Sequence, residues 1–309
     1  MIENRTLRVR TRPAMPGTVY LVGAGPGDPG LLTVRALDLL RQADVVLHDH
    51  LVSAEILAEC AVRARVVSVG KVGHGPQTDQ TAIERQLIAF ARDGYRVVRL
   101  KGGDPLLFGR GSEEAAALRA AQVPFEIVPG VSSALAAPAY AGIPLTARGV
   151  AASVAIMTGH CAGAGASPPA IPTADTLVVL MGVANSAALR DQWVAAGRSG
   201  DTPAAVIEWG TCARQRVAVA TIATLPDVIA SGGFGAPAVI VIGETVRLRS
   251  VLDWLDRSSL RPAVLETSAP PHPPGPGPAA DSRPTVGRFV NRPPPGEHVR
   301  RDGRTMDGP

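Results

Sequence analysis

Short apolar runs alternate with segments of helical periodicity along most of the chain. In the first half, such runs predict strands at residues 18–23, 44–49, 64–70 and 96–102. Apolar positions at helical spacing predict helices between them, at residues 33–43, 81–94 and 111–121. We expect Thr33 to cap the first helix, Gly94 to end the second and Ser112 to open the third. Strands that alternate with helices are typical of an α/β domain with a largely parallel sheet.

The second half repeats this pattern after a stretch that glycine and proline interrupt, PFEIVPGVSSALAAPAYAGIPLT. Further apolar runs predict strands at residues 153–159, 176–182, 203–210 and 237–243. We therefore predict two α/β domains with mostly parallel sheets, which meet near residue 130 and hold a cofactor and substrate cleft between them. The predicted divisions are a flexible N-terminal extension, an N-terminal domain, a C-terminal domain and a tail, at residues 1–15, 16–130, 131–256 and 257–309.

Composition narrows the class of protein. The chain has 309 residues and is 46% hydrophobic, enough to fill real cores. No apolar stretch reaches the length of about 18 residues that a membrane helix needs, and no signal-peptide core follows the N-terminus. The net charge of +4 comes from arginines near the two ends, so the folded part has no basic field for nucleic acid. We expect a cytoplasmic protein without membrane or nucleic-acid partners.

The cysteines and the tail add two further expectations. Cys60, Cys161 and Cys212 form no CxxC pair, which argues against a metal centre or a disulfide framework. The tail is rich in proline and arginine and has few apolar residues, so we predict that it is disordered.

The first strand leads into a glycine-rich loop, VGAGPGDPG. Its glycines fit the GxGxxG spacing of a dinucleotide-binding loop. However, Pro26 and Pro29 have no N–H to donate to a phosphate, and Asp28 would put a negative charge beside one. The loop is therefore predicted to border a ligand that carries no phosphate, or to be a structural turn.

Two later strand ends carry candidate polar groups. In KGGDP, two glycines allow close approach of a ligand to the backbone, and Asp104 supplies a carboxylate for an ammonium or a hydroxyl group. In HDH, Asp49 ends a strand, where α/β sheets build their sites, and is a candidate acid or base. From these stretches alone, a turn with a capped helix is an equally open interpretation of the Asp104 segment, and a helix cap or turn is the more common role of a residue such as Asp49. The histidines beside Asp49 lack an assignable third ligand, so we predict no metal.

Together, seven segments resemble, in order, the uroporphyrinogen-III C-methyltransferases of the tetrapyrrole methylase superfamily. They are VYLVGAGPGDPGLLTVRALDLLRQADVVLHDHLVS, VVSVGK, VVRLKGGDPLLFGRGSEEA, IVPGVSSALAAPAYAGIPLT, VAIMTGH, LVVLMG and PAVIVIGETVRLR. The likeness covers about residues 17–256. Only the two ends of the chain lie outside it.

The resemblance implies a two-domain enzyme, usually a homodimer, that binds S-adenosylmethionine. Such an enzyme methylates uroporphyrinogen III at C2 and C7, giving precorrin-2 through precorrin-1, for sirohaem or cobalamin synthesis. No metal is implied. The family's cofactor contacts fall on Pro26, Gly102, Gly103, Asp104, Leu107, Ser132, Ser133, Met181 and Gly210. Its acid and base positions fall on Asp49 and Lys71.

Those assignments match the chemistry of the ligands. The methyl donor has an ammonium, a carboxylate, a ribose and an adenine, and we expect free N–H groups from the glycine pair and the two serines to meet some of these. The substrate's carboxylates need cations, for which Arg110 and Arg148 are candidates, together with Lys71. For each of the three, a surface or structural ion pair is the alternative.

Some positions depart from the family pattern. Lys71 is followed by Val72 where relatives have a second cation, Ala147 stands where they have a histidine, and Ser133 where alanine is common. A methyltransferase of the same fold that acts on a later corrin precursor is the alternative function. A nicotinamide-dependent oxidoreductase or a nucleotide-binding module is a further one, which the two loop prolines disfavour. A fusion with dehydrogenase and ferrochelatase activity is not expected.

Overall fold

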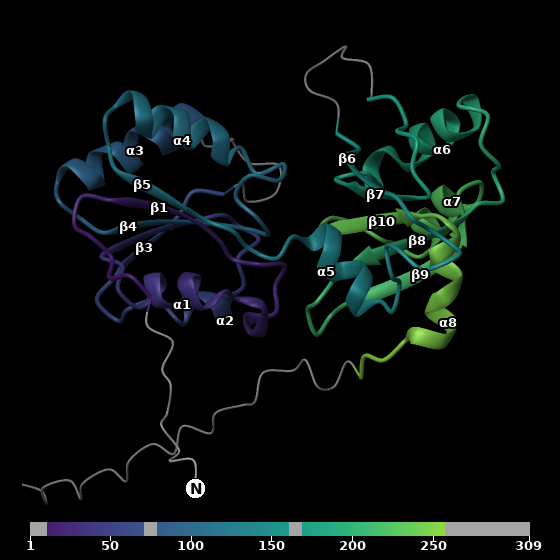
Figure 1. Ribbon diagram of the computed structural model, residues 1–309, viewed down its shortest axis with the longest axis horizontal. Coiled ribbons are helices and arrows are strands. Elements are labelled where there is room, and N and C mark those ends of the chain that lie inside the picture. Colours follow the sequence, from purple (N-terminus) through teal and green to yellow (C-terminus); the bar gives the residue numbers. More distant parts are fainter. Residues whose placement is uncertain (1–10, 71–78, 161–168, 257–309) are drawn as a thin grey trace, which may run out of the picture. The chain divides into compact units, whose positions relative to one another are not determined.

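The structure is a computed structural model that describes residues 11–70, 79–160 and 169–256 (Figure 1). The predicted tail, Lys71 and Cys161 lie outside these ranges. Two five-stranded sheets, each packed against helices, confirm the predicted α/β class. The first sheet ends at residue 128 and the second begins at residue 154. The predicted boundary near residue 130 falls between the sheets and remains a prediction.

All strands of the first sheet run parallel, in the order β3-β2-β4-β1-β5. Their bounds are β1 Val19–Gly23, β2 Val45–His48, β3 Arg65–Ser68, β4 Val97–Lys101 and β5 Phe125–Val128. The helices are α1 Val34–Leu40, α2 Ala54–Leu57, α3 Gln80–Arg92 and α4 Gly111–Ala120, with the short 3₁₀ helix η1 at Pro29–Leu31. Figure 1 shows α1 and α2 on one face of this sheet and α3 and α4 on the other. Parallel strands need such crossover connections.

Local signals set most helix ends in this domain. The Thr33 hydroxyl accepts a hydrogen bond from the Ala36 N–H at 3.1 Å, as predicted for an N-cap. Gly94 follows α3 with a φ of 85°, also as predicted. The prediction that Ser112 opens α4 is wrong, because the Gly111 N–H already donates to the Pro105 carbonyl at 3.1 Å and the helix starts there. A tight backbone turn therefore replaces the expected side-chain cap.

Residues 11–15 belong to the folded domain, although they fall in the predicted flexible extension. Ala14 is buried in the core beside α1, and its N–H donates to Gln42 Oε1 at 3.0 Å. The Met15 N–H donates to the Tyr20 hydroxyl at 2.7 Å. The polar, arginine-rich sequence does not indicate these contacts, because they are made by single backbone N–H groups. The described part of the extension is thus ordered against the first domain.

The second sheet is mostly antiparallel, which corrects the prediction of two mostly parallel sheets. Its order is β6-β7-β10-β8-β9, and only β6 and β7 pair in parallel. The bounds are β6 Val154–Thr158, β7 Thr176–Leu180, β8 Pro203–Glu208, β9 Arg216–Thr221 and β10 Ala238–Ile242. A buried strand gives an apolar run in either orientation, so the sequence pattern carries no information on strand direction. The short segment between β8 and β9 leaves no room for a crossover helix.

Several elements were not predicted from the pattern. They are β5, β9, α2 and the helices of the second domain, namely α5 Ser133–Tyr140, α6 Ser186–Ala195, α7 Leu225–Ser231 and α8 Arg249–Leu252, with 3₁₀ helices η2 Val183–Asn185 and η3 Glu244–Leu248. The helix α5 contains Pro138, which in the sequence indicates the end of a helix. The edge strand β9 is only partly buried and so lacks a clear apolar run. α5 and η3 pack on one face of the second sheet and α6 and α7 on the other. Among the described residues, no helix is both long and apolar enough to cross a membrane.

An ion pair joins the residues that precede two neighbouring strands of the first sheet. Asp44 precedes β2 and accepts hydrogen bonds from Arg96, which precedes β4, at 2.7 Å from Nη2, 2.8 Å from Nε and 3.0 Å from the backbone N–H. These bonds hold the pKa of Asp44 at about 2, below its ordinary value of 3.8. Because the folded-state pKa is lowered, the ionised carboxylate stabilises the fold above pH 4, and that contribution is lost as the pH falls toward 2.

We predict that Asp44→Asn lowers the free energy of unfolding by about 1–2 kcal/mol at pH 7. This is less than the full pKa shift implies, because both side chains are about one-quarter exposed and water screens them. The difference from wild type should shrink between pH 4 and pH 2, as measured by urea unfolding at several pH values. Asp191→Asn, at an exposed ion pair, is the control and should change little. A difference that does not vary with pH would contradict this account.

Candidate functional site

Three loops at the carboxyl ends of β1, β4 and β5 touch one another through their backbones. Gly25 and Gly103 exchange two hydrogen bonds, with N–O distances of 3.2 and 2.7 Å. A methyl group on Gly130 would lie 2.3 Å from the Gly103 carbonyl oxygen, and one on Gly23 would lie 2.5 Å from the backbone of Gly130. Side chains at these positions would force the loops apart. Gly23 and Gly130 are therefore required by the packing of loop on loop, whereas a methyl group on Gly102 or Gly103 would meet no atom closer than 3.8 Å.

Asp104 ties two of these loops together. Its Oδ1 accepts the Leu106 N–H at 2.8 Å, and its Oδ2 accepts the Gly130 N–H at 3.1 Å. A carboxylate has about four acceptor positions, so capacity for a ligand ammonium remains. The structure corrects the expectation that the N–H groups of the glycine pair are free. Gly102 donates to Asp49 and Gly103 to Gly25, so these two N–H groups already have partners.

Asp49 follows β2 and is held at two points. Its Oδ1 accepts from Arg99 Nη2 at 2.5 Å, and its Oδ2 accepts from the Gly102 N–H at 3.3 Å. These two hydrogen bonds fix the carboxylate from the side of the core. The side chain is 31% exposed, so the carboxylate is still accessible. The alternative role as a helix cap does not apply, because Ser53 caps α2 instead. This geometry suits a group that accepts a proton from a bound molecule.

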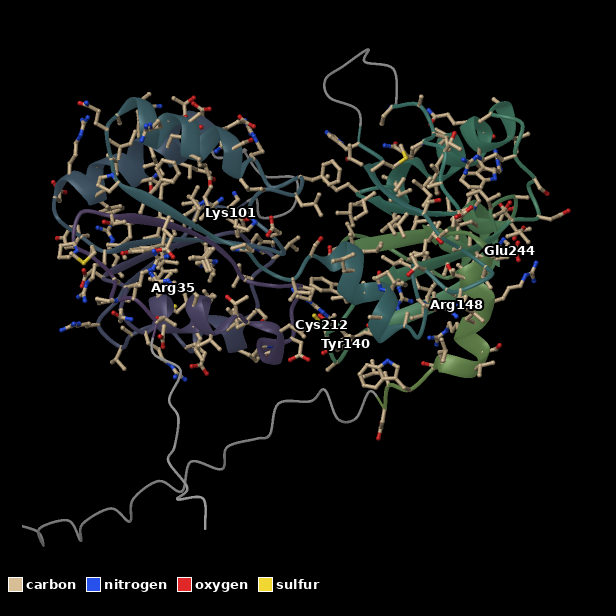
Figure 2. All side chains as sticks on the ribbon, in the orientation of Figure 1. Arg35, Lys101, Tyr140, Arg148, Cys212 and Glu244 are labelled. Carbon is tan, nitrogen blue, oxygen red and sulfur yellow. The ribbon has the colours of Figure 1, made fainter. Side chains whose placement is uncertain are left out.

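Behind Asp49 lies a buried group of charges that the sequence did not single out as a site. Arg99 and Lys101 project from β4, and Glu114 projects from the first turn of α4; all three are 3% exposed or less. Glu114 Oε1 accepts from Arg99 Nε at 3.0 Å and from Lys101 Nζ at 3.1 Å. Burial lowers the pKa of Lys101. Figure 2 labels Lys101 within the first sheet's domain.

The loop that follows β1 makes hydrogen bonds through Asp28. Its Oδ1 accepts the Gly30 N–H at 2.7 Å, its Oδ2 accepts the Tyr140 hydroxyl at 2.7 Å, and its N–H donates to Thr211 Oγ1 at 3.3 Å. Burial and this hydrogen bond raise the pKa of Tyr140 to about 12. Tyr140, which Figure 2 labels on α5, thus stays protonated and donates. Asp28 therefore has a structural role, in which two neutral donors hydrogen-bond to its carboxylate.

Several residues after β7 and β8 adopt left-handed backbone angles. Met181 has a φ of 55°, Trp209 of 49° and Thr211 of 71°, values that non-glycine residues rarely adopt. Such strain collects at functional sites. Met181 is half exposed, and Gly210 packs so closely on α5 that a methyl group would lie 2.4 Å from Ala137 Cβ. Strain therefore falls at or beside two of the positions assigned by resemblance.

Two of the remaining predicted site residues lie beside the loop after β4, since a methyl group on Gly103 would lie 3.9 Å from Ser132 Cα and from the Ser133 nitrogen. Ser132 is buried and caps α5 by accepting the Ala134 N–H at 3.2 Å, and Ser133 begins that helix. Pro26 is half-buried in its loop, and Leu107 packs partly buried against the core that contains α5. Ser132, Ser133 and Leu107 thus have structural roles that the sequence did not reveal.

The two predicted cations differ in their surroundings. Arg110 is exposed and forms a two-point ion pair with Glu113, at 2.9 and 2.7 Å. Arg148 is exposed and forms no ion pair within the described ranges (Figure 2). Lys71 lies outside the described residues. Arg148 is thus the candidate that is free to meet a carboxylate of another molecule.

An apolar cavity lies apart from the residues of the predicted site. A cavity of about 520 Å³ is apolar and belongs to the second domain, lined by α5, the turn after it and residues 251–254. It includes none of the predicted site residues. Among the described residues, no group of three or more His, Cys, Asp or Glu could hold a metal ion. The candidate site is therefore defined by the strand-end loops and Asp49, and its metal-free character remains a prediction.

The fold and these loops define an α/β protein whose glycine-rich strand ends carry two partly exposed carboxylates, Asp49 and Asp104. A model of the family "Tetrapyrrole (Corrin/Porphyrin) Methylases" matches residues 18–226, so the chain belongs to this family. It is similar to the crystal structure of uroporphyrin-III-C-methyltransferase from Thermus thermophilus, with 42% identity and a TM-score of 0.67 over 76% of this chain and 98% of that one. A structure of the Thermus enzyme with S-adenyl homocysteine is 40% identical, with a TM-score of 0.64 over 75% and 99% of the two chains.

Curated relatives are longer proteins. "Siroheme synthase 2" of Aeromonas salmonicida is 50% identical over 246 residues, which are 79% of this chain and 51% of the relative. "Siroheme synthase" of Pseudomonas fluorescens is 47% identical over 79% of this chain and 53% of its own length. The chain spans about half the length of the curated relatives it matches. The predicted family resemblance is confirmed, and the chain is a methyltransferase of the tetrapyrrole methylase family.

We predict that Gly23→Ala destabilises the first domain by about 1–3 kcal/mol, the usual cost of overpacking. The new methyl group would lie 2.5 Å from Gly130 and 2.6 Å from the Gly103 oxygen, and both obstacles are backbone. Urea unfolding measures the change. Gly235→Ala is the matched control, since its methyl group would meet nothing closer than 3.7 Å. Equal stability of the two variants would contradict the packing role of the three loops.

Proposed function

We propose that this chain catalyses the S-adenosylmethionine-dependent C-methylation of uroporphyrinogen III at C2 and C7. The product is precorrin-2, formed through precorrin-1, for sirohaem or cobalamin synthesis. The observation that carries the proposal is the 42% identity across 98% of a uroporphyrin-III-C-methyltransferase. The siroheme synthases, of which the chain matches about half, support a substrate of this class.

The chemistry of the loops supports S-adenosylmethionine as the methyl donor. That molecule carries an ammonium, a carboxylate, a ribose and an adenine, and no phosphate. The loop with Pro26 and Pro29 lacks the N–H donors that a phosphate needs, and their absence does not weaken the binding of a ligand without phosphate. Asp104 retains acceptor positions for the ammonium, and half-exposed Met181 offers an apolar surface. A solved relative complexed with S-adenyl homocysteine agrees with this assignment.

The residues around Asp49 would serve the proton step. S-adenosylmethionine supplies an electrophilic methyl group; a pyrrole carbon forms the new C–C bond as the C–S bond breaks. The methylated macrocycle must then lose a proton, and the Asp49 carboxylate, held by Arg99 and Gly102, is suited to accept it. Most of the rate should come from alignment of the two carbons. Exposed Arg148, and Arg110 if it leaves Glu113, would bind carboxylates of the substrate.

The remaining expectations rest on the family resemblance. A homodimer and a cytoplasmic location remain predictions, and so does the choice between sirohaem and cobalamin as the product's destination. A solved cobalt precorrin-4 methyltransferase is 30% identical, with a TM-score of 0.66, which keeps a later corrin precursor as the alternative substrate.

Purified protein should transfer radiolabelled methyl groups from S-adenosylmethionine to enzymatically made uroporphyrinogen III. We expect two methyl groups per macrocycle, measured by label incorporation and by the mass of the product. Binding of S-adenosylhomocysteine, measured by calorimetry, verifies that the purified protein is folded and able to bind the cofactor product. Protein that binds the cofactor product but transfers no label to uroporphyrinogen III would reject the proposal. Transfer only to a later corrin precursor would establish the alternative.

Asp104 and Asp49 should separate binding from turnover. We predict that Asp104→Ala weakens S-adenosylmethionine binding about tenfold or more, because an ammonium loses its carboxylate partner. Asp49→Ala should keep the affinity and lower turnover about 100-fold or more, the usual contribution of a general base. Calorimetry and steady-state rates measure the two effects, with exposed Asp191→Ala as control. An equal loss of binding in both variants would contradict this division of roles.

A further inference from the structure

The central strand β4 carries two cations on a face that is otherwise apolar. Arg99 stands in register with Leu21 of β1 and Leu47 of β2, both members of the core beneath α3 and α4. Lys101 lies two residues further on and therefore on the same face. Both are nearly inaccessible, with 3% and 2% of their surface exposed. Burying two charges in such a core is costly unless each is paired.

One carboxylate from α4 serves both cations. Glu114 is fully buried, and its Oε1 accepts from Arg99 Nε at 3.0 Å and from Lys101 Nζ at 3.1 Å. Its Oε2 has no hydrogen-bond partner within the described part of the chain. One carboxylate cannot balance two cations. The second carboxylate of the group is Asp49, which Arg99 reaches with its other end.

Arg99 links the two carboxylates rigidly. Its Nε binds Glu114, its Nη2 binds Asp49, and its Nη1 donates to the backbone carbonyls of Leu47 and Leu100 at 3.5 and 3.3 Å. The guanidinium is planar, so its orientation at one end sets its orientation at the other. Glu114 thus acts on the position of Asp49 although the two side chains share no bond.

A role in stability alone does not account for this arrangement. Replacing buried ion pairs by apolar residues of similar volume is often neutral or stabilising. The neighbouring apolar residues show that this face accepts such side chains. Ion pairs connect the buried side chain of Glu114 on α4, through Arg99, to the accessible Asp49 carboxylate at the end of β2.

We propose that Glu114 is a positioning residue that acts through Arg99 to fix the Asp49 carboxylate for proton transfer. The inference rests on the proposed function, in which Asp49 accepts the proton. Lys101 completes the group by balancing Glu114, so that the network of two cations and two carboxylates has no net charge. This role predicts a loss in the chemical step and not in binding.

Glu114→Gln keeps the shape of the side chain and removes its charge. We expect kcat to fall about 10- to 100-fold, the scale of a small misplacement of a reacting group. KM for uroporphyrinogen III and the affinity for S-adenosylhomocysteine should stay within about twofold of wild type, since Asp49 is not assigned to binding. Glu244→Gln is the matched control, because Glu244 pairs with an arginine on the surface of the second domain (Figure 2). An unchanged kcat in Glu114→Gln would overturn the inference.

A double-mutant cycle with Asp49→Asn separates positioning from general destabilisation. If Glu114 acts through Asp49, adding Glu114→Gln to Asp49→Asn should cause little further loss in single-turnover rate. An equal loss in both backgrounds would mean a structural role and would overturn the inference. Full turnover by Asp49→Asn would also overturn it. Wild-type protein is measured in the same assay. If the wild type transfers no methyl group, the proposed function is rejected. If the wild type is active but the variants do not behave as expected, only the inference about Glu114 is overturned.

A second variant guards against poor folding of Glu114→Gln. Arg99→Lys keeps the positive charge but lacks the planar group that joins two carboxylates. It should lower kcat by a similar factor while thermal unfolding and S-adenosylhomocysteine binding show a folded protein. A folded Arg99→Lys variant with wild-type kcat would contradict the link between the two carboxylates.

Discussion

Close contact of backbone with backbone at the ends of β1, β4 and β5 is the constraint on which the candidate site depends. Parallel strands bring their carboxyl ends to one edge, and the loops that leave them must share a small space. Gly23 and Gly130 lie there so close to each other and to the Gly103 carbonyl oxygen that neither has room for a Cβ. Once these loops are in contact, Asp104 can bridge two of them and the Gly102 N–H can reach Asp49. Gly23 and Gly130 thus allow this edge to pack whether or not a ligand is bound.

The second organising feature is electrostatic. An α/β core normally fills the buried face of its central strand with branched apolar residues, and here Arg99 and Lys101 replace them. These cations form ion pairs with two carboxylates. Glu114 is buried in the core, and Asp49 lies at the accessible end of β2. The site therefore combines loops that exclude side chains with a carboxylate whose orientation is set from within the core.

The loop after β1 combines a GxGxxG spacing with features that do not suit a nucleotide's phosphates. Pro26 and Pro29 remove donors, and Asp28 is engaged by Gly30, Tyr140 and Thr211. The chain aligns with nearly the whole of one methyltransferase structure and with about half of the siroheme synthases. A methylase unit common to both kinds of protein accounts for these two coverages.

The sequence by itself determined the α/β class, four of the five strands of the first domain, the caps at Thr33 and Gly94, and the motifs that identify the family. These properties depend on local periodicity, on backbone angles and on short stretches of residue types. Only the tertiary structure decided that the second sheet is mostly antiparallel, because an apolar strand reads the same in either direction. It also decided that the N–H groups of Gly102 and Gly103 are already engaged, that Tyr140 holds Asp28, and that Glu114 meets Arg99. Each of these pairings joins residues that are distant in the chain or lie on different elements, and no local pattern encodes which partner a buried polar group will find.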